Sequence, residues 1–261
     1  MEARAYRWIT VGSAGPVATL TLNRPERRNA IGTVMVNELL WALSDATADA
    51  DVKCVVITGA GKAFCAGGDF SQMTGGDDDA ALPPKGDYKD LLLALWRSEK
   101  PIIARVNGHA MGGGLGVVAA CTFAIASTEA KLGTPEVNVG LFPFMIMALL
   151  ERVMGRRALV EMMLLGKRLT AEEAAARGLV NRAVVPAELD AAVGELAAEI
   201  AEKSPSALRL GLRALADTED LDLDAKLPVL SQRLGECLGT DDAREGLSAF
   251  LEKRAPRWTG H

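Results

Sequence analysis

A glycine-rich segment, Asn107–Gly116, restricts the folds open to this chain more than any other segment. The apolar run Pro101–Val106 precedes it, and the apolar run Leu115–Ala120 follows it. This order predicts a strand, a tight turn and the start of a helix. The adjacent glycines Gly112–Gly114 allow the turn to adopt backbone angles closed to other residues, and they let a ligand approach the main chain.

This turn has two interpretations. The first N–H groups of a helix lack an internal partner, and the helix dipole makes that end electropositive, so a negatively charged oxygen can bind there. Alternatively, the glycines only allow the helix to pack closely on the sheet. The segment by itself does not favour one interpretation over the other.

The composition of the 261 residues excludes several classes of protein. Hydrophobic residues make up 49% and charged residues 24%, which is typical of a globular protein. The net charge of −5 does not suggest a nucleic-acid-binding surface. Residues 1–8 lack the apolar core of a signal peptide, and the longest apolar run, Val137–Leu150, is too short to span a bilayer. We therefore expect a soluble, cytoplasmic protein.

The cysteines and histidines do not form a pattern typical of a zinc site. No two cysteines are spaced as Cys-x-x-Cys, and the histidines are His109 and His261. We expect all four cysteines to be buried, reduced thiols: Cys54, Cys65, Cys121 and Cys237.

Hydrophobic periodicity predicts an α/β core followed by a helical C-terminal region, with strands concentrated before about residue 140. The predicted strands are a hairpin within residues 6–22 and the runs 52–58, 101–106 and 123–126. The predicted helices are residues 33–48, 88–98 and several segments from 144 onward, including 171–178, 187–202, 205–216 and 241–254. Residues 74–87 are polar and rich in glycine and proline, which indicates a mobile surface loop or a lid.

Two segments with glycines follow the predicted strand at residues 52–58. The first, Gly59–Phe64, is not a dinucleotide fingerprint, because Phe64 stands where that motif needs a third glycine. It is not a phosphate-binding loop either, because Ala63 follows Lys62. The second, Phe64–Asp69, is another turn of small residues.

Two further features each have a functional and a structural interpretation. The loop at residues 23–30 contains three arginines, which form either a solvated turn or a cationic rim for a polyanionic ligand. Glu136 is the only carboxylate between Glu129 and Glu151, and it lies in apolar sequence. Burial would raise its pKa toward neutrality and suit it to proton transfer, whereas the simpler interpretation is a hydrogen-bonded structural glutamate.

Together, these segments resemble the enoyl-CoA hydratase/isomerase family, the crotonase superfamily. In the family's order, the matching segments are Leu22–Pro25 with Asn29 and Ala30, Phe64–Asp69, Asn107 and Gly108 with Gly112–Gly114, Pro135 and Glu136, and Phe250–Arg254. The resemblance implies an α/β fold, a crotonase-like spiral of ββα units with a helical C-terminal region, assembled as a homotrimer or a dimer of trimers. We accordingly expect an acyl-CoA-binding core at residues 1–200 and an oligomerisation region at residues 201–261.

The resemblance also implies a site for an acyl-CoA thioester, with coenzyme A as part of the substrate. By position, the N–H groups of Gly68 and Gly113 bind the thioester oxygen and stabilise the enolate that forms when a proton is moved beside it. The candidates for binding the phosphates or adenine end of coenzyme A are Arg24, Arg28 and Lys253. Backbone groups near Ala30, Ala66 and Gly68 line the path of pantetheine and adenine.

The chain departs from the family's hydratases at one position. Those hydratases typically use two glutamates around one water, and one of the two lies two residues past the glycine triplet. Here that position is Gly116, while the second glutamate is present as Glu136. We expect Gly116 to leave extra room near the acyl group.

One carboxylate can carry a proton between the α and γ carbons of an enoyl thioester, which isomerises the double bond. We therefore expect an isomerase, or a hydratase-like enzyme, that works through Glu136 alone. The alternatives are another acyl-CoA lyase or hydrolase of the family, and a non-catalytic acyl-CoA-binding protein. No metal, nucleotide cofactor, nucleic acid or membrane partner is implied.

Overall fold

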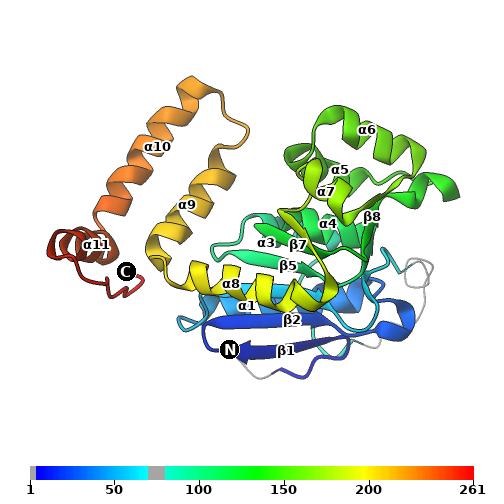
Figure 1. The fold of residues 1–261 in the computed structure, drawn as a ribbon, viewed down its shortest axis with the longest axis horizontal. Helices are drawn as coiled ribbons and strands as arrows, with labels where there is room; N and C mark the ends of the chain where they lie inside the picture. Colours follow the sequence, from blue (N-terminus) through cyan, green and yellow to red (C-terminus); the bar gives the residue numbers. More distant parts are fainter. Residues whose placement is uncertain (1–3, 70–79) are drawn as a thin grey trace.

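The computed structural model describes residues 4–69 and 80–261 (Figure 1). Within these ranges the strands form a six-stranded sheet, in the order β1-β2-β3-β5-β7-β10, and a four-stranded sheet, in the order β4-β6-β8-β9. Part of the predicted loop, residues 74–79, lies outside the described residues. The rest of that loop, residues 80–87, is irregular.

The large sheet starts with the predicted hairpin. Its strands are β1 (Ile9–Ala14), β2 (Val17–Leu22), β3 (Cys54–Gly59), β5 (Ile102–Val106), β7 (Phe123–Ser127) and β10 (Arg182–Val184). The β1–β2 pair is antiparallel, and each following pair is parallel. The small sheet consists of β4 (Ala63–Cys65), β6 (His109–Met111), β8 (Lys131–Gly133) and β9 (Arg168–Thr170). Its first three strands are parallel, and β9 runs antiparallel to β8.

Alternate residues of the central strands face two different hydrophobic clusters. Val55 and Ile57 belong to the main core, together with α1 (Thr33–Ala48), α3 (Tyr88–Trp96) and α4 (Gly113–Ala120). Cys54 and Val56 pack instead against α8 (Leu189–Ala201). Because side chains alternate along a strand, β3 is buried on both sides, as its continuous apolar sequence predicts.

The C-terminal half is mostly helical, as predicted. Its remaining helices are α5 (Phe144–Val153), α6 (Arg156–Leu165), α7 (Ala171–Ala176), α9 (Pro205–Thr218), α10 (Leu223–Leu238) and α11 (Asp241–Glu252). Short 3-10 helices occur at η1 (Pro25–Arg27), η2 (Pro135–Val139) and η3 (Pro186–Glu188). Figure 1 shows α9, α10 and α11 standing clear of the sheets, at the opposite end of the view from α5 and α6.

The structure differs from the sequence predictions in its short strands and in one cysteine. The strands β4, β6 and β8 lie in segments that were expected to be turns or were given no structure. The strands β9 and β10 follow residue 140, where only helices were expected; each has three residues, too few for a periodic pattern to show. Cys237 is half-buried rather than buried, whereas Cys54, Cys65 and Cys121 are buried free thiols as predicted. None of the helices within the described ranges is both long enough and apolar enough to cross a bilayer.

Candidate active site

Three neighbouring strands of the small sheet bring the sequence motifs together. The strands β4, β6 and β8 are parallel neighbours, so their carboxyl ends meet at one edge of the sheet. The turn after β4 contains Gly68, the turn after β6 leads into Gly113, and the 3-10 helix after β8 contains Glu136. The first two turns touch, because a Cβ on Gly67 would lie 3.1 Å from the main-chain oxygen of Met111.

A cavity of about 400 Å³ opens at this edge. Gly68, Gly113 and Glu136 all contribute to its wall, so the three predicted catalytic positions share one space. Five residues around the start of α5 form an apolar side of it: Leu141, Phe142, Phe144, Met145 and Ile146. The cavity therefore combines two backbone turns and one carboxylate with an apolar wall.

The backbone at Gly113 is suited to binding an anion. Gly113 is the first residue of α4, so its N–H has no partner within the helix and the helix dipole adds positive potential. Among the described residues, the N–H groups of Gly68 and Gly113 donate no hydrogen bond to a main-chain carbonyl of a turn, loop or cap. The preceding residue, Gly112, has a φ of 49°, which favours glycine at this turn.

Glu136 has the environment of a general base. Burial raises the pKa of its carboxyl group above the usual value. Its Oε2 atom is buried and has no hydrogen-bond partner among the described residues, and its Oε1 lies 2.5 Å from where a Cβ on Gly112 would stand. A side chain on Gly112 would displace the carboxylate, so the glycine turn and Glu136 depend on each other.

Two other carboxylates of the described residues line this cavity, and both are already engaged. Asp69 forms a salt bridge with Arg24. Asp87 caps the N-terminus of α3 and accepts a hydrogen bond of 2.9 Å from Lys89. Among the described residues that line the cavity, Glu136 is therefore the carboxylate best placed to exchange a proton with a ligand.

The structure contradicts the expectation of extra room at Gly116. A Cβ on Gly116 would lie 2.3 Å from Cγ2 of Ile146 and 2.4 Å from the phenol oxygen of Tyr88. Both distances are far shorter than a van der Waals contact. The volume that a glutamate side chain would enter is filled, because α3 and α5 pack their side chains against the bare backbone of α4.

Tyr88 was not predicted as a site residue. Its hydroxyl donates a hydrogen bond of 2.5 Å to the carbonyl of Gly113, and its ring lines the cavity that contains Glu136. The sequence offers only a weak signal for it, a tyrosine directly after a helix-capping aspartate. No local pattern connects it with a glycine turn 25 residues further along the chain.

The predicted coenzyme A residues are only partly brought together. Ala30 and Ala66 are both partly exposed. Their segments are neighbours, since the N–H of Ala66 donates a hydrogen bond of 2.9 Å to the carbonyl of Arg28. The side chain of Arg28 is exposed at the same place. In contrast, Arg24 is 12% exposed, bound to Asp69 and stacked 3.9 Å from the ring of Trp8.

Lys253 lies far from these residues in the single chain. It ends α11 with a φ of 56°, and α11 lies at the end of the molecule away from α5 in Figure 1. Its predicted contact with coenzyme A remains a prediction, as do those of Arg24, Arg28, Ala30 and Ala66.

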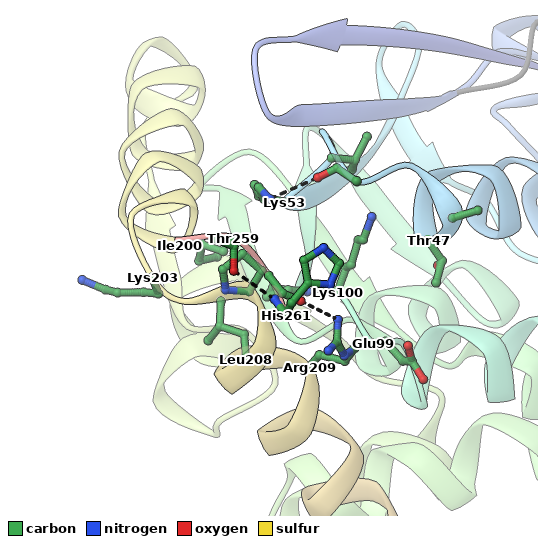
Figure 2. Close-up of a pocket in the computed structure, with 16 residues that line it drawn as sticks. Thr47, Lys53, Glu99, Lys100, Ile200, Lys203, Leu208, Arg209, Thr259 and His261 are labelled. Carbon is green, nitrogen blue, oxygen red and sulfur yellow. Dashed lines mark hydrogen bonds between the residues drawn. The ribbon is translucent and has the colours of Figure 1, made fainter. Parts of the chain in front are cut away.

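A second cavity, of about 220 Å³, lies beside residues 259–261 and contains none of the motif residues (Figure 2). Its cations bind main-chain carbonyls: Lys53 donates over 3.1 Å, Lys100 over 2.7 Å and Arg209 over 3.3 Å. Lys203 points away from the cavity in Figure 2. The carbonyl that Arg209 binds belongs to Gly260, so this contact ties α9 to the C-terminal residues, while Lys53 and Lys100 bind carbonyls of Ala50 and Ala46 around the end of α1.

The chain is similar to known proteins over almost its whole length. A family model described as enoyl-CoA hydratase/isomerase matches residues 12–261. A short-chain-enoyl-CoA hydratase of Clostridium acetobutylicum is 36% identical over 248 residues, which cover 94% of this chain and 95% of the relative. A 2,3-dehydroadipyl-CoA hydratase of Escherichia coli is 36% identical over 246 residues, which cover 94% of this chain and 95% of the relative.

A solved structure shows the same architecture. The crystal structure of an enoyl-CoA hydratase of Mycobacterium smegmatis matches with a TM-score of 0.88 at 33% identity, and the match covers 97% of this chain and 99% of that chain. The likeness therefore includes the C-terminal helices as well as the two sheets.

Proposed function

The chain belongs to the enoyl-CoA hydratase/isomerase family and has the crotonase fold, and from this premise we propose that Glu136 moves a proton beside the thioester carbonyl of an enoyl-CoA. The N–H groups of Gly68 and Gly113 bind the thioester oxygen during this step. The observation that carries the proposal is the shared cavity, in which a carboxylate of raised pKa lies beside two backbone turns.

The physical basis is the charge that develops in the reaction. Removing a proton from the α carbon delocalises an electron pair onto the thioester oxygen. Two fixed N–H donors stabilise that oxygen without reorganisation, and losing one such donor typically costs about 3–4 kcal/mol. Burial of Glu136 raises its pKa, which brings the carboxylate closer in basicity to the carbon acid that it must deprotonate.

The acid/base groups at the cavity favour double-bond isomerisation. In that reaction Glu136 takes a proton from the α carbon of a 3-enoyl-CoA and returns it to the γ carbon, so one carboxylate completes the cycle and no water is consumed. Hydration needs one group to activate water and a proton for the α carbon. Position 116, where the family's second carboxylate is expected, has no side chain and no free space.

Hydration of a 2-enoyl-CoA is the second candidate, because the relatives at 36% identity are named as hydratases. These two relatives act on different acyl groups, a short chain and a dehydroadipyl group, at the same identity to this chain. Identity alone therefore does not select the acyl group for this protein. The apolar wall at the start of α5 favours an apolar acyl chain.

We also propose that the protein acts as a homotrimer or a dimer of trimers in the cytoplasm. Residues 1–200 form its acyl-CoA-binding core, and residues 201–261 form its oligomerisation region. The exposed leucines and phenylalanine of α10 and α11 support such a contact surface.

Purified protein tested separately on a 3-enoyl-CoA and a 2-enoyl-CoA distinguishes the two reactions. Conversion of the 3-enoyl-CoA to its conjugated isomer, without a hydroxyacyl product, is the expected result. Formation of a 3-hydroxyacyl-CoA from the 2-enoyl-CoA establishes hydration instead. Binding of both esters without turnover would contradict both reactions and favour a non-catalytic acyl-CoA-binding protein.

A further inference from the structure

The polar group that occupies the place of a second carboxylate is the hydroxyl of Tyr88. A Cβ on Gly116 would lie 2.4 Å from this oxygen, so a side chain from position 116 would enter the space that the phenol fills. The same hydroxyl donates to the carbonyl of Gly113. Tyr88 thus contacts the first turn of α4 at the two positions that the family pattern assigns to the oxyanion hole and to the second carboxylate.

The chain holds Tyr88 in place through two neighbouring elements. Asp87 forms a capping box with Asp90, which fixes the start of α3 at Tyr88. Just upstream, the buried side chain of Asn37 on α1 accepts the N–H of Gly86 at 3.0 Å. The indole of Trp41 on the same helix donates to the carbonyl of Pro83 at 3.0 Å. The phenol is therefore presented to α4 by a segment anchored on both sides.

Tyr88 is a hydrogen-bond donor rather than a base in this position. Burial raises the pKa of its hydroxyl well above the usual value, so the phenol keeps its proton at neutral pH. The nearby thiol of Cys65 and the carboxyl of Glu136 act in the same direction. A neutral phenol cannot replace the family's second carboxylate in acid/base chemistry, but it can fix the geometry of the backbone that it contacts.

We propose that Tyr88 is a positioning residue of the oxyanion hole: its hydroxyl binds the carbonyl of Gly113 and thereby orients the N–H of Gly113 toward the thioester oxygen. This inference rests on the proposed function. The N–H and the carbonyl of Gly113 are joined through a Cα that carries no side chain. Gly113 is the first residue of α4, at the frayed end where the helix constrains its backbone least, so a hydrogen bond to its carbonyl adds a restraint on the direction of the N–H.

The same arrangement explains why position 116 is glycine. Any side chain there would push the phenol away from Gly113 and Ile146 out of the core. Tyr88 therefore excludes a second carboxylate from this helix while it supports the oxyanion donor. The protein combines a rigid oxyanion hole with a single acid/base group, and the two properties come from one side chain.

The test is Tyr88→Phe, which removes one oxygen atom and keeps the ring. The probe is para-dimethylaminocinnamoyl-CoA, whose absorption moves to longer wavelength when hydrogen bonds polarise its thioester carbonyl. We expect the variant to bind the probe with a dissociation constant within about threefold of the wild type but to give a smaller red shift. We expect kcat on the reactive enoyl-CoA to fall about tenfold or more, because a misplaced donor loses part of its effect on the transition state.

The matched control is Tyr6→Phe, the same change at the other tyrosine of the chain, which does not line the cavity. We expect it to retain the wild-type red shift and kcat. A Tyr88→Phe protein with the wild-type red shift and kcat would overturn the proposal. So would a variant that melts earlier but shows an undiminished red shift in its folded, probe-bound form, because the role of Tyr88 would then be packing alone.

Failure of the proposed function gives a different result. If the wild type itself binds the probe without any red shift, then Gly68 and Gly113 do not polarise the thioester, and the oxyanion hole falls together with the role of Tyr88. If the wild type shows the red shift and Tyr88→Phe shows the same red shift, the proposed oxyanion hole is retained and only the role of Tyr88 is rejected.

Discussion

At the level of a single residue, the proposed reaction depends on the carboxylate of Glu136 as its base. Changing Glu136→Gln keeps the size of the side chain and removes the base, so we expect kcat to fall about 10²–10⁴-fold. Binding of the acyl-CoA should change little, since the thioester oxygen and coenzyme A are bound by other groups. Steady-state kinetics and a binding titration check this, and a Gln variant that retains full turnover would rule out Glu136 as the acid/base group.

The raised pKa of Glu136 also predicts the sign of a stability change. Burial favours the protonated form in the folded state, so the stabilising contribution of this group is present below its unfolded pKa and is lost as the pH rises through its folded pKa. At neutral pH the buried carboxylate is therefore destabilising. We expect Glu136→Gln to unfold at higher urea concentration than the wild type at neutral pH, with the difference shrinking toward pH 4. Equal midpoints at both pH values would contradict the burial of the charge.

Gly116 and Gly194 offer a matched pair of glycine substitutions inside helices. A Cβ on Gly194 meets nothing within 4 Å, whereas one on Gly116 meets Tyr88 and Ile146. We expect Gly194→Ala to stabilise the protein by up to about 1 kcal/mol through helix propensity. Gly116→Ala should instead destabilise it by about 1–3 kcal/mol through overpacking and should lower kcat. Urea unfolding of both variants measures the contrast, which disappears if Tyr88 and Ile146 do not pack against α4.

At the level of secondary-structure elements, the loop that contains η1 is the predicted contact for coenzyme A. Arg28 is exposed beside Ala30 and Ala66, while Arg24 is neutralised by Asp69. We expect Arg28→Ala to raise KM for a coenzyme A ester about tenfold, as loss of a charged hydrogen bond would, and to leave KM for the matching pantetheine thioester unchanged. Arg27→Ala is the control from the same loop. An equal effect on both substrates would argue against a phosphate contact.

Asp242 joins α11 to α9 and to the C-terminal residues. It is 1% exposed and accepts hydrogen bonds from Ser204 at 2.8 Å, Thr259 at 2.7 Å and Gly260 at 3.0 Å. Burial opposes its ionisation, but these hydrogen bonds outweigh burial and hold its pKa well below the usual value. Its stabilising contribution is therefore present above its unfolded pKa of about 3.9 and is lost as the pH falls toward its folded pKa.

We expect Asp242→Asn to lower the free energy of unfolding by about 2 kcal/mol at neutral pH, because a buried charged acceptor is replaced by a neutral amide. The difference should stay constant above about pH 5 and shrink below pH 4. Unfolding curves across this range test it. Asp241→Asn, at the exposed neighbouring position, is the control and should change stability by less than about 0.5 kcal/mol. A similar loss of stability in both variants would mean that the buried hydrogen bonds of Asp242 do not stabilise the fold.

At the level of the whole molecule, the C-terminal helices present an apolar face. On α11 the side chains of Leu247, Phe250 and Leu251 are 60%, 81% and 80% exposed, and their spacing places them on one side of the helix. We expect light scattering to give a mass of about three or six times 27.6 kDa. Leu251→Asp should reduce that mass, while Ser13→Asp on exposed β1 should not. A monomeric wild type would contradict the proposed assembly.

Much of the fold was predictable, because strands and helices of sufficient length carry their periodicity in local sequence. The hairpin β1–β2, the buried strand β3 and the helices α1, α3 and α4 all follow their patterns. The three-residue strands β4, β6, β8, β9 and β10 were missed, since so short a segment acquires its structure from its neighbours in the sheet.

By itself, the sequence determined the family, the longer strands and helices, the glycine turns at Phe64–Asp69 and Asn107–Gly116, and the carboxylate at position 136. These properties reside in consecutive residues or in spacings along one strand or helix. Only the tertiary structure decided that the ends of β4, β6 and β8 meet at one cavity, that Arg24 is occupied by Asp69, and that Tyr88 fills the space beside Gly116. Such contacts join residues far apart in the chain, and side-chain packing in three dimensions selects them, so no local pattern records them.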